Sequence, residues 1–294
     1  MKITDWFNIK LGLVCVFLCF TVQSEAKIAL PTLLSDGMVL QRDCIVKIWG
    51  TSDAGEKVNL AFCGKTYQTV ADEQGNWIIG LSPLKAGGPY DMQINEITLH
   101  DILIGDVFLC SGQSNMELMV SRVMDKFADE VKSYENPMIH YIKVPYNYNF
   151  RNPQADIRQA CWQALTQENV MGYSALCYFF AKLLYQQTGI PVGIVNSSWG
   201  GTPVEAWISE NGLKDFPSYL NQKSMYECDS LVDDIQRIER MRQQVWQAVL
   251  CNADEGLHSS IPWYAETLKD DSWQTVDMFS DVWATNGWKP KNGS

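Results

Sequence analysis

The stretch Ile104-Gly-Asp-Val-Phe-Leu-Cys-Ser-Gly-Gln-Ser-Asn-Met-Glu-Leu-Met119 decides the fold of this chain. Its first part, up to Cys110, is rich in strand formers, Ser111 to Asn115 is a cluster of turn formers, and helix-compatible residues follow. The pattern predicts a strand, a tight turn and the start of a helix. Ser114, at the tip of this turn, is expected to project past the carboxyl end of the strand, where the first helical amides have no partner within the helix.

A second polar turn follows the next predicted buried strand. Ile190 to Asn196 is predicted as that strand, and Ser197 to Gly201 as a glycine-rich turn. Residues 117–133 and 175–187 are predicted as helices, so strands and helices alternate. One face of the second helix is expected to carry Leu176, Phe179, Phe180, Leu183 and Leu184. Alternation of this kind predicts a parallel sheet, so we expect Ser114 and the second turn to meet at its carboxyl edge.

Two β-rich segments flank this α/β region. Residues 27–103 contain short strand-forming runs separated by Gly and Asp turns, which predicts a small antiparallel β-sandwich. The α/β domain is expected over residues 104–260, including a long amphipathic helix from Leu231 to Ala253 whose charges indicate a solvated face. Trp-rich, strand-like residues 261–294 predict the beginning of an inserted β-domain. The predicted fold class is therefore α/β with a preceding sandwich.

The first 26 residues have the pattern of a signal peptide. Lys2 and Lys10 flank the start, Leu11 to Phe20 is an uncharged apolar run, and Ser24 and Ala26 are small residues before a cleavage point. The apolar run is much shorter than the roughly 20 residues that a membrane-spanning helix needs. We therefore expect a secreted or periplasmic protein without a membrane anchor once this leader is removed.

The composition narrows the partners of the chain. The formal net charge is -11, which does not match the basic surface that nucleic acid binding requires. The chain has 11 Trp and 12 Tyr, which suit sugar rings and equally suit ordinary packing.

The leader holds Cys15 and Cys19 of the nine cysteines, so seven remain, without metal-type spacing. We expect mostly buried free thiols, with one disulfide as the alternative, and no metal.

Ester hydrolysis by a serine needs a nucleophilic hydroxyl, donors for the oxyanion, a general base and a carboxylate that orients the base. Ser114 can supply the hydroxyl. Candidate oxyanion donors are its own amide, the amides of Gly200 or Gly201, and the side-chain amides of Asn115 or Asn196. From the local pattern alone, Ser and Asn are also ordinary helix caps.

Four ordered motifs together are much more specific than the serine turn alone. They are Leu33 to Arg42, Gly105-Asp-Val, Cys110-Ser-Gly-Gln-Ser-Asn-Met116, and Gly193 to Trp207. In these motifs the chain resembles the sialic-acid-specific 9-O-acetylesterases, or sialate O-acetylesterases, of the SGNH hydrolase superfamily. The resemblance extends from Leu30 essentially to the end of the sequence.

The resemblance implies a fold, a reaction and a nucleophile. The expected core is an SGNH-type, flavodoxin-like, three-layer parallel sheet, with an accessory sandwich and an inserted β-domain. Ser114 is the implied nucleophile, and the amides of Ser114, Gly200 and Gly201 are the implied oxyanion donors. The implied reaction removes O-acetyl groups from sialic acid or a related acetylated glycan and needs no cofactor.

Further residues are candidates for the site around the serine. Gln113 and Asn115 complete its turn. Glu205 and Trp207, just past the second turn, are candidate substrate-binding residues, and packing at a helix start explains them equally well. An arginine can bind the carboxylate of sialic acid bidentately. The arginines considered for this are Arg42, Arg122, Arg151 and Arg158.

The general base and its orienting acid are missing from the pattern. In the family they come from a DxxH block near the carboxyl end of the catalytic domain, and this sequence contains no DxxH. Its three histidines are His100, His140 and His258, and we interpret each as structural. Loss of a triad member in serine proteases leaves about 10³ to 10⁴ of rate enhancement over water. We therefore expect weak catalysis and predict an incomplete copy of a longer enzyme.

Two other functions fit the same residues. One is deacetylation of a plant polysaccharide such as xylan, because the serine motif does not specify the sugar. The other is a non-catalytic glycan-binding protein that keeps the pocket and the Trp-rich surface without the base.

Overall fold

The computed structural model describes residues 28–273, except residues 158, 262, 264 and 270. The expected leader, residues 1–26, lies outside the described residues, and so do residues 274–294 of the expected inserted β-domain. The chain forms two compact units that divide between Leu220 and Asn221.

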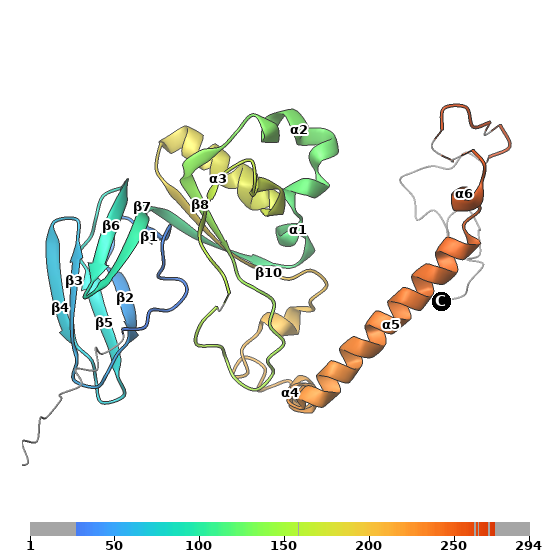
Figure 1. The fold of residues 1–294 in the computed structure, drawn as a ribbon. Helices are drawn as coiled ribbons and strands as arrows, with labels where there is room; N and C mark the ends of the chain where they lie inside the picture. The colour runs from blue at the N-terminus through green and yellow to red at the C-terminus, as the bar shows by residue number, and fades with distance from the viewer. Residues whose placement is uncertain (1–27, 158, 262, 264, 270, 274–294) are drawn as a thin grey trace, which may run out of the picture. The chain divides into compact units, whose positions relative to one another are not determined.

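The first part of the described chain folds as an antiparallel β-sandwich, as the sequence predicted (Figure 1). Its strands are β1 (Val39–Gln41), β2 (Val46–Thr51), β3 (Lys57–Phe62), β4 (Lys65–Val70), β5 (Asn76–Leu81) and β6 (Gly87–Ile94). Strands β2 and β5 form one sheet, and β3, β4 and β6 lie in the other. Buried and exposed residues alternate along β3 and β5, because successive side chains of a strand point to opposite faces. The buried side chains of both sheets form one apolar core.

Strand β7 (Ile97–Gly112) connects the sandwich to the α/β sheet. Its first half pairs antiparallel with β6, and β1 pairs parallel with Leu103 to Gly105. Its second half, from Asp106 to Gly112, pairs parallel with β10 (Val192–Ser198). Within the described residues, no strand pairs with the other edge of this second half. The predicted domain boundary between residues 103 and 104 thus falls inside a continuous strand.

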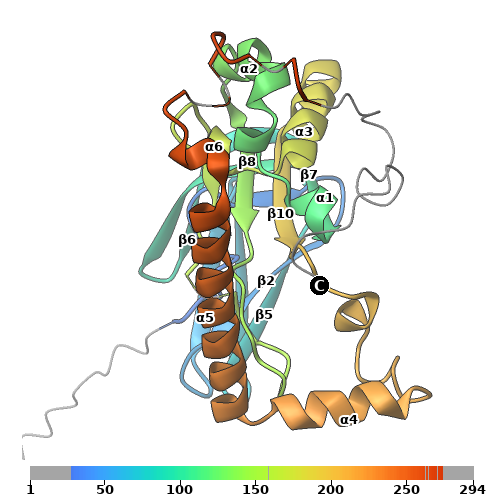
Figure 2. The ribbon, with the colours of Figure 1, turned by 90° about the vertical axis from the view of Figure 1, so that its right-hand side faces the viewer.

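The second half of β7 begins a mixed sheet in the order β7, β10, β8 (Asn136–Lys143) and β9 (Gln163–Leu165). The first three strands are parallel and β9 is antiparallel. Helices α2 (Met124–Lys132) and α3 (Ala175–Thr188) lie beside β8 and β10 in both Figure 1 and Figure 2. Parallel strands combined with helices confirm the predicted α/β class.

The helix predicted after the serine turn is broken into pieces. Helix α1 (Ser114–Glu117) is followed by extended residues Leu118 and Met119, with ψ angles of 116° and 151°. A short 3₁₀ turn, Val120–Arg122, then precedes α2. The interruption has a tertiary cause, because Met119 forms an isolated β-bridge with Ser174. A pattern of neighbouring residues does not show such a contact.

Helix α3 has the predicted ends, but the predicted apolar stripe is not its buried face. The helix is capped by Ser174, whose hydroxyl accepts the N–H of Cys177 at 3.3 Å, and Gly189 after it has a φ of 66°. The residues that it buries are Ala175, Cys177, Tyr178, Ala181 and Lys182. Three members of the stripe are exposed, namely Leu176, Phe180 and Leu183. The buried face therefore combines three small residues with the large side chains of Tyr178 and Lys182.

The rest of the described chain is mainly helical. Its elements are a 3₁₀ helix (Val204–Trp207), α4 (Pro217–Tyr226), α5 (Asp229–Ala253) and α6 (Glu255–His258). Helix α5 confirms the predicted long helix, and its apolar side chains, including Val245 and Trp246, are exposed. The described residues between 261 and 273 contain turns. None of the helices in the described ranges has both the length and the apolar character needed to cross a membrane.

The prediction of mostly buried thiols is wrong. Among the seven described cysteines, Cys177 is buried and Cys110 is partly buried. The other five are exposed, namely Cys44, Cys63, Cys161, Cys228 and Cys251. None of these exposed residues belongs to the apolar cores, because turns, loops and the exposed surface of α5 carry them. All seven are free thiols.

Candidate functional site

Ser114 lies at the first residue of α1, directly after the end of β7. Gly112 has a φ of 141°, a conformation that favours glycine, and it turns the chain from the strand toward the helix. Ser114 and its neighbours Gln113 and Asn115 are exposed, and the Ser114 hydroxyl donates to Oε1 of Gln113 at 3.0 Å. The first amides of a helix have no partner within it. A hydroxyl and backbone donors thus occur together at an open surface.

The turn from Ser197 to Gly201 lies against the serine turn. The backbone N–H of Trp199 donates to the carbonyl oxygen of Gly112 at 2.9 Å. A Cβ atom added to Gly200 would lie 3.6 Å from the Cα atom of Ser114, which is ordinary van der Waals contact. The structure therefore brings together the two turns that the sequence predicted at one sheet edge.

Glu117 connects α1 to this second turn. Its Oε2 atom accepts a hydrogen bond from the backbone N–H of Gly200 at 2.5 Å. The Gly200 amide, one of the candidate oxyanion donors, thus already points at an anionic oxygen. The other candidate, Gly201, follows with a φ of 78°. Sequence analysis missed Glu117, although its position three residues after Ser114 on a helix places both on one face.

Lys143, the last residue of β8, holds the second turn through hydrogen bonds of its ammonium group. Its Nζ donates to Oδ1 of Asn196 at 2.8 Å and to the carbonyl and hydroxyl oxygens of Ser198 at 2.9 and 3.0 Å. An ammonium group has three N–H donors, so all of them are used. Burial lowers the pKa of Lys143. Asn196 is fully buried in this network, so its side-chain amide does not face the exposed hydroxyl of Ser114.

Two thiols lie under the serine turn, Cys110 on β7 and Cys177 on α3. The hydrogen bond between them and the burial of the first thiol raise the pKa of Cys110. A raised pKa keeps a thiol neutral and unreactive at neutral pH. Cys110 also packs against the apolar core of the α/β region.

Hydrogen bonds also join the two turns through Gln113. Its Nε2 donates to the carbonyl oxygen of Thr202 at 3.0 Å. The Thr202 hydroxyl donates to the carbonyl oxygen of Trp199 at 2.7 Å and accepts from Nε1 of Trp207 at 2.9 Å. Trp207 is therefore connected to the serine turn, and the partly exposed Glu205 lies in the same 3₁₀ helix. Thr202, which lies in the motif Gly193 to Trp207, was not predicted as a site residue.

The three histidines have partners elsewhere. Both ring nitrogens of the buried His140 face backbone carbonyl oxygens, at 2.5 and 2.9 Å. His100 lies 3.0 Å from a sandwich aspartate, and His258 lies 3.0 Å from a backbone carbonyl oxygen of its own unit. None of these contacts involves Ser114, so no general base is in hydrogen-bond contact with its hydroxyl among the described residues.

The arginines considered for a substrate carboxylate differ in their surroundings. Arg42 contacts both carboxylate oxygens of Asp106, at 2.8 and 3.2 Å, and its bidentate capacity is therefore used within the protein. Arg122 is exposed in the turn after α1, and Arg151 is exposed in the segment after β8. Arg158 lies outside the described residues. The described residues include no cluster of His, Cys, Asp or Glu that could hold a metal ion.

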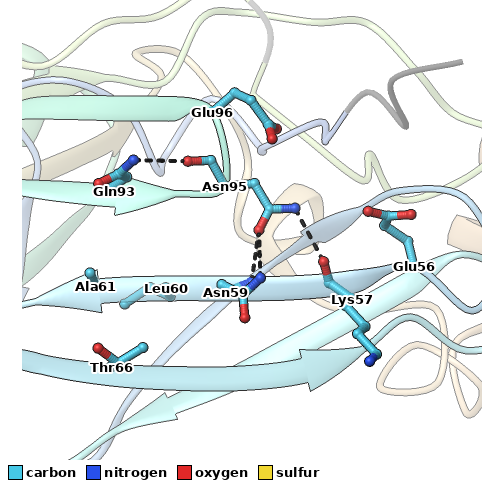
Figure 3. A pocket seen from close by; sticks show the side chains of 9 residues that line it. All are labelled: Glu56, Lys57, Asn59, Leu60, Ala61, Thr66, Gln93, Asn95 and Glu96. Atoms are coloured by element: carbon cyan, nitrogen blue, oxygen red, sulfur yellow. Dashed lines mark hydrogen bonds between the residues drawn. The ribbon is translucent and has the colours of Figure 1, made fainter. Parts of the chain in front are cut away.

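A separate polar pocket lies on the sandwich (Figure 3). Asn95, with a φ of 46°, forms the turn between β6 and β7, and its Oδ1 accepts the backbone N–H of Asn59 at 2.8 Å. Its Nδ2 donates to the carbonyl oxygen of Lys57 at 3.2 Å, and Gln93 donates to its carbonyl oxygen at 3.2 Å. The hydrogen bonds of Asn95 and Gln93 therefore support the turn between β6 and β7.

Known proteins are similar to much of this chain. The family model for carbohydrate esterases of the sialic acid-specific acetylesterase type matches residues 104–251. The sialate O-acetylesterase of Rattus norvegicus is 32% identical over 202 residues, covering 60% of this chain and 36% of that protein. The Homo sapiens protein of that name is 31% identical over 202 residues, covering 62% and 39%. The chain thus spans little more than a third of the length of these relatives.

A solved structure is similar in sequence and in fold. It is the crystal structure of a carbohydrate acetylesterase from Xanthomonas citri, which superposes with a TM-score of 0.60 at 38% sequence identity. The match covers 63% of this chain and 43% of that one.

Proposed function

The chain belongs to the sialic acid-specific acetylesterase family of carbohydrate esterases, and we propose that it acts as a serine esterase on O-acetylated sialic acid. In this proposal Ser114 is the nucleophile. The close approach of Gly200 to Ser114 supports the proposal, because it brings the glycine-rich second turn beside a serine whose side chain is exposed.

The proposed reaction is acyl transfer through an acetyl-serine. The Ser114 oxygen attacks the acetyl carbonyl carbon while the serine proton passes to a base, and the amides of Ser114 and Gly201 donate to the oxyanion. Collapse of this intermediate breaks the bond to the sugar oxygen, which takes up a proton and leaves as a hydroxyl. Water then attacks the acetyl-serine, which releases acetate and restores Ser114.

None of the described residues that contact the Ser114 hydroxyl is a general base for this reaction. No histidine ring contacts Ser114, and the sequence has no DxxH block. A serine hydroxyl without an adjacent base is a weak nucleophile. We therefore expect slow turnover by the chain alone and faster turnover when a base is supplied from solution.

Imidazole can supply that base, and it provides the test. Acetate release from O-acetylated sialic acid is measured over a range of imidazole concentrations for the full chain and for Ser114→Ala. The expected result is a rise with imidazole that exceeds the rise measured with Ser114→Ala. Ser111→Ala, which removes an exposed hydroxyl of the same turn, should behave as the unmodified chain. Equal slopes for the chain and Ser114→Ala would contradict the role of Ser114.

A second candidate substrate is the acetyl group of another glycan, such as acetylated xylan. It is favoured by the Xanthomonas citri structure, which is that of a carbohydrate acetylesterase and is 38% identical. The same assay with acetylated xylan distinguishes the two sugars. Binding of either glycan without Ser114-dependent acetate release would support a glycan-binding protein instead.

Export is part of the proposal and rests on the pattern of residues 1–26 alone. Cleavage of this leader should leave Lys27 as the first residue. Sequencing the amino terminus of the protein recovered from outside the cytoplasm tests this, and an uncleaved Met1 would contradict it.

A further inference from the structure

Three aromatic rings gather beside the second turn. Tyr146 stacks on Trp199 with a centroid distance of 4.4 Å and an interplanar angle of 20°. Tyr148 meets Trp199 edge-on, at 4.8 Å and 64°. The tyrosines come from the segment after β8 and the tryptophan from the turn after β10, and Figure 1 shows these two segments leaving the same edge of the sheet. We call Tyr146, Tyr148 and Trp199 the aromatic shelf.

The aromatic shelf is held in place by groups already described. The backbone N–H of Trp199 is bonded to Gly112, at the end of β7. The Nζ atom of Lys143 lies 5.4 Å from the centroid of the Tyr146 ring, within the range of a cation–π contact. Since Lys143 is itself fixed by Asn196 and Ser198, the ring is positioned by a rigid network.

The tyrosines of the shelf do not serve the apolar core. Tyr146 is 48% exposed and Tyr148 is 56% exposed, and neither belongs to the two buried clusters of the first unit. They lie in a segment, Val144 to Trp162, whose described residues form neither helix nor strand. Long connections of this kind in compact domains are usually functional or disordered. Aromatic rings that are ordered by contacts and still open to solvent have the form of a binding surface.

The aromatic shelf lies next to the proposed nucleophile. Trp199 directly precedes Gly200, and neighbouring Cα atoms are about 3.8 Å apart. A Cβ atom on Gly200 would in turn lie 3.6 Å from the Cα atom of Ser114. The backbone of Trp199 therefore lies close to the serine turn.

The groups that the aromatic shelf leaves open to solvent indicate which part of the sugar it contacts. The three N–H donors of Lys143 are used by protein oxygens, so this ammonium group has none left for a substrate carboxylate. What remains open is the aromatic surface of Tyr146 and Tyr148. Such a surface matches the apolar C–H face of a pyranose ring better than a charged group.

We propose that Tyr146, Tyr148 and Trp199 form a sugar-binding subsite that stacks against the pyranose ring of the acetylated sugar and holds its acetyl group at Ser114. This inference rests on the proposed function and adds the residues that recognise the sugar. It assigns substrate recognition to two tyrosines of the loop after β8 together with Trp199 of the second turn.

The experiment measures the dissociation constant of the full chain for O-acetylated sialic acid by calorimetry, in a Ser114→Ala background that prevents turnover. Tyr146→Leu and Tyr148→Leu should each raise the dissociation constant by about tenfold, the loss expected for one aromatic contact. Tyr90→Leu is the matched control, because Tyr90 is also an exposed tyrosine and lies on the sandwich. It should leave the constant unchanged.

Two further measurements keep the outcomes distinct. Tyr146→Phe and Tyr148→Phe preserve the rings and should retain affinity, so a loss in the leucine variants alone is not explained by unfolding. Two results would overturn the proposed sugar-binding subsite. One is unchanged affinity in the leucine variants, and the other is no sugar binding by the Ser114→Ala chain. The role of Ser114 is measured separately with p-nitrophenyl acetate, which has no sugar ring, as the imidazole-dependent acetate release in excess of that measured with Ser114→Ala, because imidazole also cleaves this ester by itself. If the leucine variants leave sugar affinity unchanged but this acetate release persists, the esterase proposal stands. If this acetate release is absent while sugar binding depends on the shelf, the esterase proposal alone is overturned.

Discussion

The two halves of strand β7 are stabilised in different ways. In the first half, Ile102, Leu103 and Ile104 are no more than 1% exposed, and the strand pairs with both β6 and β1. In the second half, Leu109 is 71% exposed, and β10 is the strand that pairs with it in the described part of the chain. One continuous strand therefore passes from an apolar scaffold to an open edge that carries the serine turn.

The difference explains how the serine turn is positioned. At the sandwich end, burial of a large aliphatic side chain contributes about 1.5–3 kcal/mol. At the other end, Ser114 is placed by individual hydrogen bonds, such as those from Gly200 to Glu117 and from Gln113 to Thr202. A typical hydrogen bond contributes only about 0.5–1.5 kcal/mol net. The scaffold end should therefore dominate stability, and the open end should dominate activity.

The largest expected effect is at the scaffold end. Leu103→Ala removes a fully buried side chain and should lower the free energy of unfolding by about 2–5 kcal/mol. Leu109→Ala, on the same strand, should change it by no more than about 0.5 kcal/mol, because most of that side chain is already in solvent. Urea denaturation followed by tryptophan fluorescence measures both. Equal losses of unfolding free energy in the two variants would contradict the distinction between the two halves of β7.

The next effect concerns the support of the second turn. Lys143→Met leaves buried acceptors of Asn196 and Ser198 without their donor and should cost about 1–3 kcal/mol. Because the folded-state pKa of Lys143 lies below its ordinary value of 10.5, the unfolded chain binds more protons between these two values. The stability of the unmodified chain should therefore rise relative to Lys143→Met as pH increases through that window. Thermal unfolding of both proteins at several alkaline pH values checks the sign, and a shrinking difference would contradict it.

A smaller loss of stability is expected at Gly200. A Cβ atom there would lie 2.4 Å from Oε2 of Glu117, so Gly200→Ala should displace this carboxylate and cost about 1–2 kcal/mol. It should slow acetylation of Ser114 at least tenfold, because it shifts the turn that carries the proposed donor Gly201, and a single oxyanion donor is worth about 10² to 10³ in rate. Gly172→Ala is the control, because an added Cβ there meets no atom within 4 Å. Equal acetylation rates in the two variants would show that the second turn does not contribute to the site.

The smallest effect is expected for Glu117→Gln. The amide oxygen of glutamine can still accept from Gly200, but the bond loses its charge assistance, at a cost of about 0.5–1 kcal/mol. Glu130→Gln provides a comparison, because that carboxylate pairs with Lys182 away from the serine turn. Only Glu117→Gln should change the rate of Ser114 acetylation. A change in both would point to a general effect of charge.

The sequence predicted the features that arise from local periodicity. The sandwich strands were recognisable because alternation and Gly or Asp turns recur there, as in β3 and β5. The meeting of the Ser114 turn with the Gly200 turn was predictable too, because parallel strands end at a common edge. The end of α3 at Gly189 followed from the left-handed conformation that glycine adopts most readily.

The features that were missed depend on contacts between distant residues. The break after α1 follows from the bridge between Met119 and Ser174. The buried face of α3 depends on which neighbours cover the helix, and hydropathy alone favoured the exposed Leu176 and Leu183. The bonds of Lys143 to the second turn join separate strands, so no spacing in the sequence reveals them.

The central claim is that Ser114 is a nucleophile positioned by the open end of β7. Because no base among residues 28–273 that the structure describes contacts it, hydrolysis of an acetyl-serine should also be slow, and the acetylated chain should accumulate. The direct measurement is peptide mass spectrometry after incubation with p-nitrophenyl acetate and acid quenching. We expect one acetyl group on the peptide that contains Ser114, and none on the corresponding peptide of the Ser114→Ala variant. An unmodified Ser114 peptide, or equal acetylation of other exposed serines such as Ser111, would contradict it.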